Sequence, residues 1–275
     1  MTNDFFQGFI PKITNRIGAV GTELQAPDWQ GLMEGDKPEP IQPNNEIWYV
    51  ATNRVTPHNT EAFGSEIVYL PEESKFDPKT GMGILKFNGD VTNIGGCAFS
   101  GCSDLTSVEI PNSVTNIEYQ AFAGCSGLTS VNIPDGVTSI GYQAFAECKS
   151  LTSVTIPDGV TSIEQKVFYE CNRLKSVTIP NSVTSIGFNA FGYCFDLTSL
   201  TIPDGVTSIG DWAFSCCNHL TSITFEAITP AILGGSWSSV FDNTSCPIYV
   251  PAQSVETYKS APGWSGVATR IQPAP

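Results

Sequence analysis

Apolar and polar positions follow one another in a fixed order through the middle of the chain. The stretch from residue 151 to residue 173 reads LTSVTIPDGVTSIEQKVFYECNR, and close versions of it recur every 23 residues. Six versions lie in uninterrupted register and begin at Met82, Leu105, Leu128, Leu151, Leu174 and Leu197. A seventh version begins at Leu220 and then diverges. A fixed period of about 20 to 50 residues is typical of a solenoid. We therefore expect one coil from each repeat.

The first half of a repeat predicts a short strand that ends in a turn. Leu151, Val154 and Ile156 are apolar, with small polar residues between them. This alternation is typical of a strand that buries one face. The segment Pro157-Asp158-Gly159 follows, and because Pro and Gly favour turn conformations, the strand is expected to stop there.

The second half predicts another extended segment and then a helical turn. Val160 and Ile163 belong to the extended segment, and Val167, Phe168 and Cys171 follow it. The spacings of three and four place these last three side chains on one face of a short helix. One coil cannot cover that face alone, so we expect neighbouring coils to pack Phe on Phe and Leu on Leu.

The motif LTSVxIPxxVTSIGxxAFxxCxx, which covers about half of the chain, resembles the leucine-rich repeats of the BspA-like type. Such repeats are common in surface proteins of host-associated bacteria. The resemblance implies a leucine-rich repeat solenoid of stacked 23-residue coils, each with short parallel strands and a helical turn, capped at both ends. It also implies a cell-surface adhesin or binding protein that recognises host or microbial macromolecules.

Residues 1–33 form an apolar segment before the repeats, and Pro11 suits the first position of a helix there. One interpretation is an anchor that docks on a partner or on copies of the same chain. The other is a leader that folds back over the first coil or stays disordered. Residues 34–44 are rich in Pro and charge and predict a semi-rigid linker. The residues assigned to the anchor are Phe5, Phe6, Phe9, Ile13, Ile17, Val20 and Leu24.

The segments on either side of the repeats, residues 45–81 and 220–275, are expected to cap the stack in residues 82–219. An uncapped solenoid exposes apolar surface and unpaired strand groups at its ends. In the first segment, the apolar runs 47–50 and 67–69 each predict a strand.

The second segment ends in CPIYVPAQSVETYKSAPGW, which resembles the terminal cap of the same family. Trp237 or Phe241 is expected to take the place of the repeat Phe. Ser254 is a candidate cap for a short helix, and Tyr258 and Trp264 are expected to cover the last coil.

Six of the nine cysteines occupy one repeat position: Cys102, Cys125, Cys148, Cys171, Cys194 and Cys217. Free Cys packs as a small apolar residue, and side chains that point in parallel from adjacent coils are poorly placed for disulfides. We expect reduced packing cysteines and no metal site, because ligands in a row cannot surround an ion. Cys97 and Cys216 fall at variable positions and are expected to be more exposed.

Charge and hydropathy exclude several classes of partner. The net charge is −14 with 13 Lys plus Arg, which argues against nucleic acid and anionic membranes. No apolar run reaches the roughly 20 residues that span a bilayer. The first residues lack the pattern of a signal peptide. Either an export signal has been removed and the protein is extracellular, or the protein is made and assembled in the cytoplasm.

Catalytic residues are not apparent. His58 falls in a cap segment and His219 at a variable repeat position. A nucleophilic Ser needs an oriented base nearby, and the sequence nominates none. Asp135, Asp158 and Asp204 recur at a turn position, where Asp is favoured for turn geometry. We predict a protein that is not an enzyme and binds no cofactor; a hydrolase is the least favoured alternative.

Two sets of side chains are candidates for partner binding. Small polar residues are expected to line the outer face of the first strand, where they also suit a tightly stacked sheet: Ser107, Ser130, Ser153, Ser176 and Ser199. Aromatic residues vary from repeat to repeat, and either serve as recognition anchors or pack between neighbouring coils: Tyr119, Tyr142, Tyr169, Phe188, Tyr193 and Trp212.

These patterns favour a non-enzymatic binding or adhesion module that presents its repeat surface to a protein or glycan at a cell surface. The alternative is a fibre or decoration protein of a bacteriophage virion, attached or self-associated through residues 1–33. In that alternative, the missing export signal and the free thiols reflect synthesis and assembly in the cytoplasm.

Overall fold

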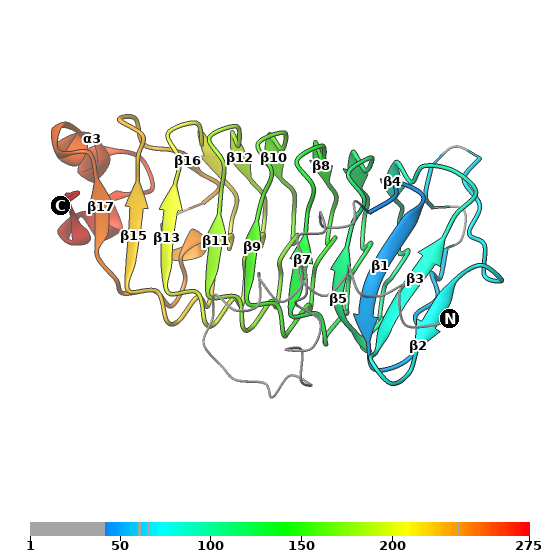
Figure 1. Ribbon diagram of the computed structural model, residues 1–275. Helices are drawn as coiled ribbons and strands as arrows, with labels where there is room; N and C mark the ends of the chain where they lie inside the picture. Colours follow the sequence, from blue (N-terminus) through cyan, green and yellow to red (C-terminus); the bar gives the residue numbers. More distant parts are fainter. Residues whose placement is uncertain (1–41, 60–61, 65, 236) are drawn as a thin grey trace, which may run out of the picture. The chain divides into compact units, whose positions relative to one another are not determined.

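Consecutive repeats stack as coils of a solenoid, and equivalent strands pair in parallel from one coil to the next (Figure 1). The computed structural model describes residues 42–59, 62–64, 66–235 and 237–275. The anchor and most of the linker predicted for residues 1–44 therefore lie outside the described residues. Residues 44–275 form one compact unit.

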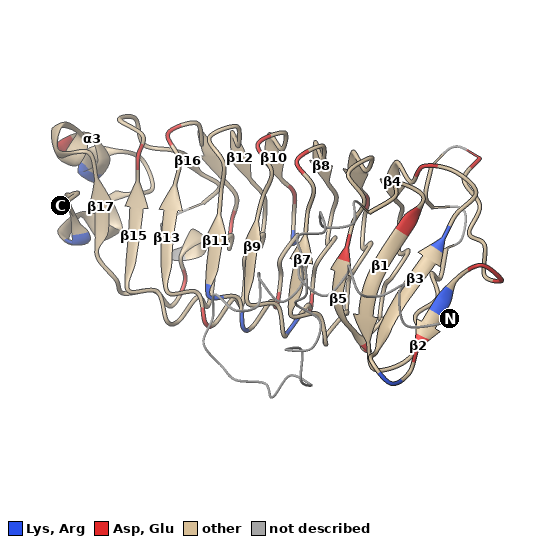
Figure 2. Cartoon of the chain, in the orientation of Figure 1, with Lys and Arg blue, Asp and Glu red and all other residues tan. Residues whose placement is uncertain are grey.

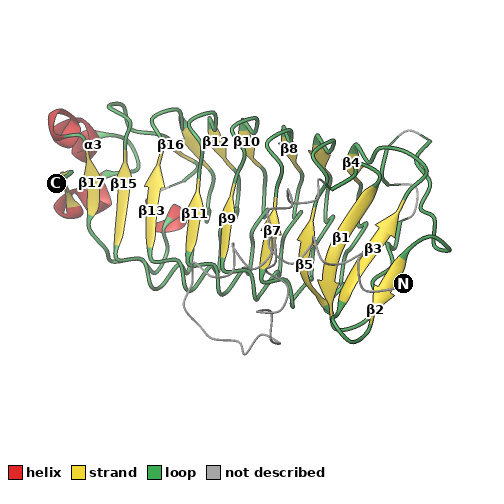
Figure 3. Ribbon diagram, in the orientation of Figure 1, coloured by secondary structure: helices red, strands yellow, loops and turns green. Residues whose placement is uncertain are grey.

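Each coil contributes one strand to a first ladder and one to a second (Figure 3). Val154 pairs with Val177, and Ile163 with Ile186, so the partners are 23 residues apart. The first ladder contains β5 (Leu105–Glu109), β7 (Ser130–Asn132), β9 (Ser153–Thr155), β11 (Ser176–Thr178), β13 (Ser199–Ile202) and β15 (Ser222–Phe225). The second contains β4 (Asn93–Ile94), β6 (Asn116–Ile117), β8 (Ser139–Ile140), β10 (Ser162–Ile163), β12 (Ser185–Ile186), β14 (Ser208–Ile209) and β16 (Ile232–Leu233).

A column of phenylalanine rings runs through the core, as the repeat predicts. Neighbouring rings lie with centroids 5.1 to 5.6 Å apart and planes within 15° of parallel. Phe241 extends the column beyond Phe214, which decides between the two candidates that the sequence left open. Since each ring is at most 1% exposed, the coils bury one continuous apolar surface. The column contains Phe99, Phe122, Phe145, Phe168, Phe191, Phe214 and Phe241.

The segment predicted as a short helix is instead a series of tight turns, here named the turn face (residues 95–102 and their equivalents in later coils). Its backbone N–H groups alternate between two kinds of acceptor. Phe168 N donates to Ala190 O of the next coil at 2.8 Å, and Tyr169 N donates to Lys166 O at 3.2 Å. A helix would keep all these bonds within one coil and leave the stack unpaired.

The turn face requires left-handed backbone at two positions in each coil. In the coil that begins at Leu151, these are Lys166 (φ 57°) and Glu170 (φ 58°). Non-glycine residues adopt such angles rarely and at some cost. The inter-coil hydrogen bonds hold the backbone in this conformation. The helical spacing of Val167, Phe168 and Cys171 does place all three inside the core.

At the N-terminal end, the strand β1 (Glu46–Ala51) interrupts the first ladder. It pairs antiparallel with both β3 (Met82–Lys86) and β5. The run of six repeats is therefore interrupted in the first ladder, between β3 and β5. In the second ladder, β4 pairs directly with β6. The side chains of Ile47, Tyr49 and Ala51 are at most 2% exposed and extend the core.

The second strand predicted at this end is wrong. Of residues 67–69, only Tyr69 makes a single bridge, to Phe87. The outer strand is β2 (Lys75–Asp77), which pairs with β3. Val68 is 53% exposed, so the apolar run that suggested a strand lies mostly outside the sheet.

The last coil is covered by non-repeat elements. Phe225 packs against Tyr258 at 5.9 Å and Trp264 at 5.0 Å between ring centroids. Tyr258 Oη donates to Ala227 O at 3.0 Å, and Trp264 Nε1 donates to Ala231 O at 3.2 Å. These elements are α2 (Trp237–Val240), β17 (Ile248–Val250), η2 (Ala252–Ser254), α3 (Val255–Ser260), η3 (Ser265–Arg270) and β18 (Ile271–Pro273).

Ser254 lies at the N-cap position of α3, but its side chain makes no capping hydrogen bond. Its backbone has φ −104° and ψ −3° because it also ends η2, whereas capping residues usually have extended backbone. Among the described residues, no helix is both long and apolar enough to cross a membrane.

Candidate binding surface

Four large aromatic side chains are exposed where the second ladder runs into the turn face. We call Tyr119, Tyr142, Phe188 and Trp212 the aromatic edge. Their exposed fractions are 55%, 44%, 40% and 48%. The first three share one repeat position and Trp212 is one residue further along. The coils therefore hold the four residues along one line of the stack, with Gln165 at the shared position in the coil between Tyr142 and Phe188.

The aromatic edge also packs between coils, which is one of the two interpretations that the sequence left open for these residues. Phe188 and Trp212 stack with centroids 6.5 Å apart and planes at 26°. The ring of Tyr119 lies over Gly96, where an added Cβ would collide with it. Because roughly half of each side chain remains open despite these contacts, a partner would still bury substantial apolar area.

Tyr169 and Tyr193 form a second cluster at the other end of the turns. Their ring centroids lie 5.6 Å apart, and Phe195 follows 5.9 Å from Tyr193. Lys166 Nζ lies 5.4 Å from the Tyr169 ring. Burial, followed by the hydrogen bond to Glu170, raises the pKa of Tyr169. Phe195 was missed, although an aromatic residue at a repeat position that otherwise holds polar residues was a usable signal.

The serine ladder on the first strand is not evenly accessible. Ser153, Ser176 and Ser199 are exposed and Ser130 is half-buried, but Ser107 is only 7% exposed. Ser107 is in register with Val50 of β1, so the inserted strand lies directly beside it. Ser130 Oγ donates to Ser107 Oγ at 3.4 Å. Only the last three serines present a free polar face.

Threonine hydroxyls beside the strands have a structural role that the sequence analysis did not identify. Thr152 Oγ1 donates to Thr129 O at 3.3 Å, and Thr207 Oγ1 donates to Thr184 O at 3.1 Å. The same bond recurs in other coils on both ladders. Part of the Ser/Thr richness therefore serves stacking rather than binding.

The cysteine column contains no disulfide in the structure. All nine cysteines are free thiols. Five thiols of the column donate to the Phe carbonyl 26 residues earlier, as Cys171 Sγ does to Phe145 O at 3.2 Å. Burial raises the pKa of the Cys102 thiol to about 11, and it raises the pKa of the Cys171 thiol well above its ordinary value. These thiols are therefore poor nucleophiles at neutral pH. Cys97 and Cys216 are half-buried, more exposed than most of the column.

Both histidines are exposed side chains. His219 Nδ1 lies 3.3 Å from Asp196 Oδ1, and its side chain is 67% exposed. His58 is exposed in the segment that follows β1. The described part of the chain holds no cluster of three or more His, Cys, Asp or Glu that could bind a metal ion.

Charged side chains lie mainly at the bends (Figure 2). The first-ladder strands from β9 to β15 contain no Lys, Arg, Asp or Glu. The strand face of these coils is therefore neutral and polar, whereas the turn face combines aromatic rings with carboxylates such as Glu147, Glu164 and Glu170.

Comparison with solved structures finds bacterial leucine-rich repeat proteins. A leucine-rich cell surface protein from Faecalibacterium prausnitzii A2-165 is 34% identical over 60% of this chain and 54% of its own, with a TM-score of 0.49. A leucine-rich repeat protein from T. pallidum is 27% identical over 52% of this chain and 68% of its own, with a TM-score of 0.46. The chain thus spans about half the length of the first.

The family comparison is more extensive. No curated protein sequence matches the chain. The family model described as the BspA type leucine-rich repeat region, in six copies, matches residues 72–194 and 138–248. Together the matches span more than half of the sequence and all the coils of the phenylalanine column. The chain belongs to the BspA-type leucine-rich repeat family.

Proposed function

We propose that the chain is a non-enzymatic adhesion or binding module that presents its coil surface to a macromolecular partner at a cell surface. One observation carries the proposal: the four side chains of the aromatic edge remain 40 to 55% exposed on a hydrogen-bonded scaffold. Membership of a repeat family that occurs in surface proteins supports the location.

The aromatic edge suits recognition because its backbone is already ordered. Phe188 O accepts from Lys166 N at 2.9 Å, and Trp212 N donates to Ser239 O at 2.9 Å. A partner that contacts these residues therefore has little backbone to immobilise. Tyr and Trp are enriched among the residues that dominate binding energy, so the edge has the composition of an anchor row.

A protein is the favoured partner, and a glycan is the second class. The net charge of −14 disfavours nucleic acid and anionic lipid surfaces. None of the similarities reported above supports attachment to a virion. The anchor proposed for residues 1–33 lies outside the described residues. Deleting that segment and measuring the mass of the particle in solution tests whether it makes an oligomer.

The proposal is tested with two matched variants. One replaces Tyr119, Tyr142, Phe188 and Trp212 with Ala, and the control replaces Ser153, Ser176 and Ser199 with Ala. Binding of each variant to immobilised extracellular-matrix proteins, mucins and bacterial surface glycans is measured by biolayer interferometry. We expect the first variant to bind at least about tenfold more weakly, equivalent to about 1.4 kcal/mol, and the control to bind like the natural chain.

Two outcomes would contradict the proposal. If the natural chain binds no member of any class on the panel, the module is not a general adhesin. If only the serine variant loses binding, the partner contacts the strand face and not the aromatic edge.

A further inference from the structure

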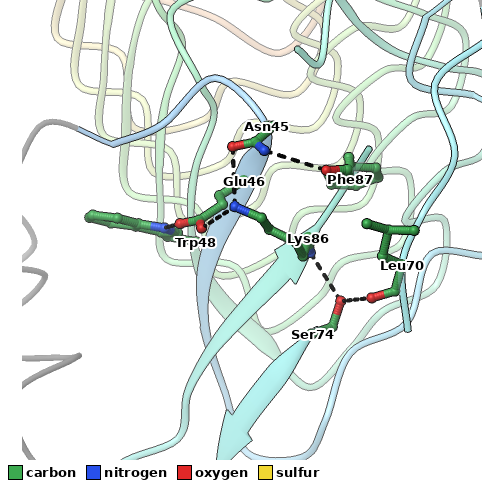
Figure 4. A network of polar contacts seen from close by, with 7 residues as sticks. All are labelled: Asn45, Glu46, Trp48, Leu70, Ser74, Lys86 and Phe87. Carbon is green, nitrogen blue, oxygen red and sulfur yellow. Dashed lines mark hydrogen bonds and ion pairs between the residues drawn. The ribbon is translucent and has the colours of Figure 1, made fainter. Parts of the chain in front are cut away.

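An amine, a carboxamide and a carboxylate meet where β1 pairs with β3 (Figure 4). Lys86 Nζ lies 2.8 Å from Glu46 Oε1 and 3.3 Å from Asn45 Oδ1. Glu46 and Lys86 are direct partners in the antiparallel ladder, and Asn45 immediately precedes β1. The strand pairing itself therefore brings the three groups together.

Each of the three residues makes a further contact. Trp48 Nε1 donates to Glu46 Oε2 at 2.7 Å, and Asn45 Nδ2 donates to Phe87 O at 3.5 Å. The backbone N of Lys86 donates to Ser74 Oγ at 3.0 Å. The Glu46 side chain is 9% exposed and that of Lys86 is 26% exposed. The amine is thus kept against the carboxamide beside a mostly buried carboxylate.

We propose that Lys86 and Asn45 join in an intramolecular isopeptide bond, with Glu46 as the group that moves the proton. Glu46 takes a proton from the Lys86 ammonium, and the neutral Nζ attacks Cγ of Asn45. An Nζ–Cγ bond forms and the Cγ–Nδ2 bond breaks. The released ammonia leaves as ammonium with the proton that Glu46 returns. The carboxylate is regenerated, and no oxidant, reductant or other reactant is needed.

The geometry favours this reaction over a plain ion pair at the same place. Groups held close together in a fixed orientation avoid much of the entropic cost of bringing them together, and Lys86 Nζ lies 3.3 Å from Oδ1 of the carboxamide whose carbon it would attack. An ion pair needs only Lys86 and Glu46, whereas here the same Nζ also contacts the carboxamide that would be consumed.

The bond would lock the inserted strand. Residues 45 and 86 are 41 positions apart in sequence, and a cross-link that closes such a loop restricts the unfolded chain. It would also tie the start of β1 to the end of β3 covalently, so these two strands could not separate at that end. For a module exposed to tension at a cell surface, this protects the end at which the first ladder is interrupted.

Intact mass spectrometry of the purified full chain under denaturing conditions tests the proposal. We expect a main species lighter than the sequence mass by one ammonia molecule, with a cross-linked Asn45–Lys86 peptide after proteolysis. Lys86→Arg and Glu46→Gln are expected to restore the full mass. Asn45→Asp is expected to lose one water molecule instead, because a carboxylic acid would replace the carboxamide.

One control excludes another source of ammonia loss. Asn88 is followed by Gly89, and an Asn-Gly pair can lose ammonia by cyclising on its own backbone. Asn88→Ser should therefore keep the mass deficit. The proposal is overturned if the folded natural chain has its full sequence mass, or if the deficit persists in Lys86→Arg. Far-UV circular dichroism establishes that each variant is folded, and the Asn45→Asp product distinguishes lost chemistry from lost structure.

Discussion

Strands of the first ladder are joined differently on the two sides of β5. From β5 onward each coil meets a copy of itself, and partners such as Val154 and Val177 lie at the same repeat position. Before β5, the strand of the first repeat meets β1, which runs in the opposite direction and is not part of the repeat. The comparison shows that a repeat specifies its neighbours only where each neighbour is another repeat.

The two regions also differ in the side-chain contacts that hold them together. In the regular coils, the phenylalanine column and the thiol-to-carbonyl bonds recur with little change. At the N-terminal end, the ring of Tyr49 occupies the space that a side chain at position 83 would need, so the insertion depends on Gly83. We expect the two regions to respond differently to substitution.

The largest effect is expected from Phe168→Ala in the regular coils. Phe168 is fully buried between Phe145 and Phe191, so removal of the ring leaves a cavity and costs about 3–5 kcal/mol of unfolding free energy. Urea denaturation measures this loss. Phe195→Ala, at a half-buried surface ring, is the control and should cost much less. A loss below about 1 kcal/mol for Phe168→Ala would contradict a shared core.

Gly83→Ala is expected to affect the N-terminal end selectively. The added methyl would overlap the Tyr49 ring, and such overpacking typically costs about 1–3 kcal/mol. Hydrogen exchange should increase in β1 and β3, while the amides of β9 to β15 keep their protection. Uniform loss of protection along the stack would show that the inserted strand is not a separate unit of stability.

Cys171→Ala is expected to change the pH dependence of stability. Burial raises the pKa of the Cys171 thiol, so the unfolded chain loses that proton first as pH rises. The stabilisation is complete below the ordinary thiol pKa and is lost progressively above it. Urea denaturation under reducing conditions from neutral to alkaline pH should give a slope shallower by about 1.4 kcal/mol per pH unit in the variant. Parallel curves would mean that the thiol ionises equally in both states.

The smallest effect is expected from Thr152→Val. Thr152 Oγ1 donates to Thr129 O at a partly exposed position, so water can replace the bond. We expect at most about 0.5–1.5 kcal/mol of destabilisation, and no change in the hydrogen exchange of β1. Thermal unfolding of the variant beside the natural chain provides the measurement. A loss as large as that of Phe168→Ala would show that the hydroxyl ladders, and not the core, dominate stacking.

Repeat positions predicted the inside of the molecule well and the ends less well. The apolar residues of the coils and the free thiols are where the pattern predicts them. The strand predicted for residues 67–69 is wrong because an apolar pattern does not specify which edge of a sheet a segment pairs with. The strand β2 pairs with that edge of β3 instead. The short helix predicted in each coil is wrong because turns that form hydrogen bonds with the next coil bury the same side chains at the same spacing.

The candidate binding surface could also be predicted only in part from the sequence. The aromatic edge could be found from its unusual side chains at two adjacent repeat positions. Its exposure could not be predicted, since exposure depends on what the neighbouring coil places above each ring. Ser107 belongs by sequence to the same ladder as Ser153, yet the inserted strand lies against it. Contact between Asn45, Glu46 and Lys86 has no sequence signature, because it joins residues on both sides of a 41-residue separation.

By itself, the sequence determined the period, the buried positions and the family of this protein. The reason is that each coil buries the same face against a copy of itself, so local pattern and tertiary neighbour coincide. Only the tertiary structure decided where β1 enters, which surface remains open and which polar groups meet. Those features depend on contacts between unlike segments, and no periodicity records them.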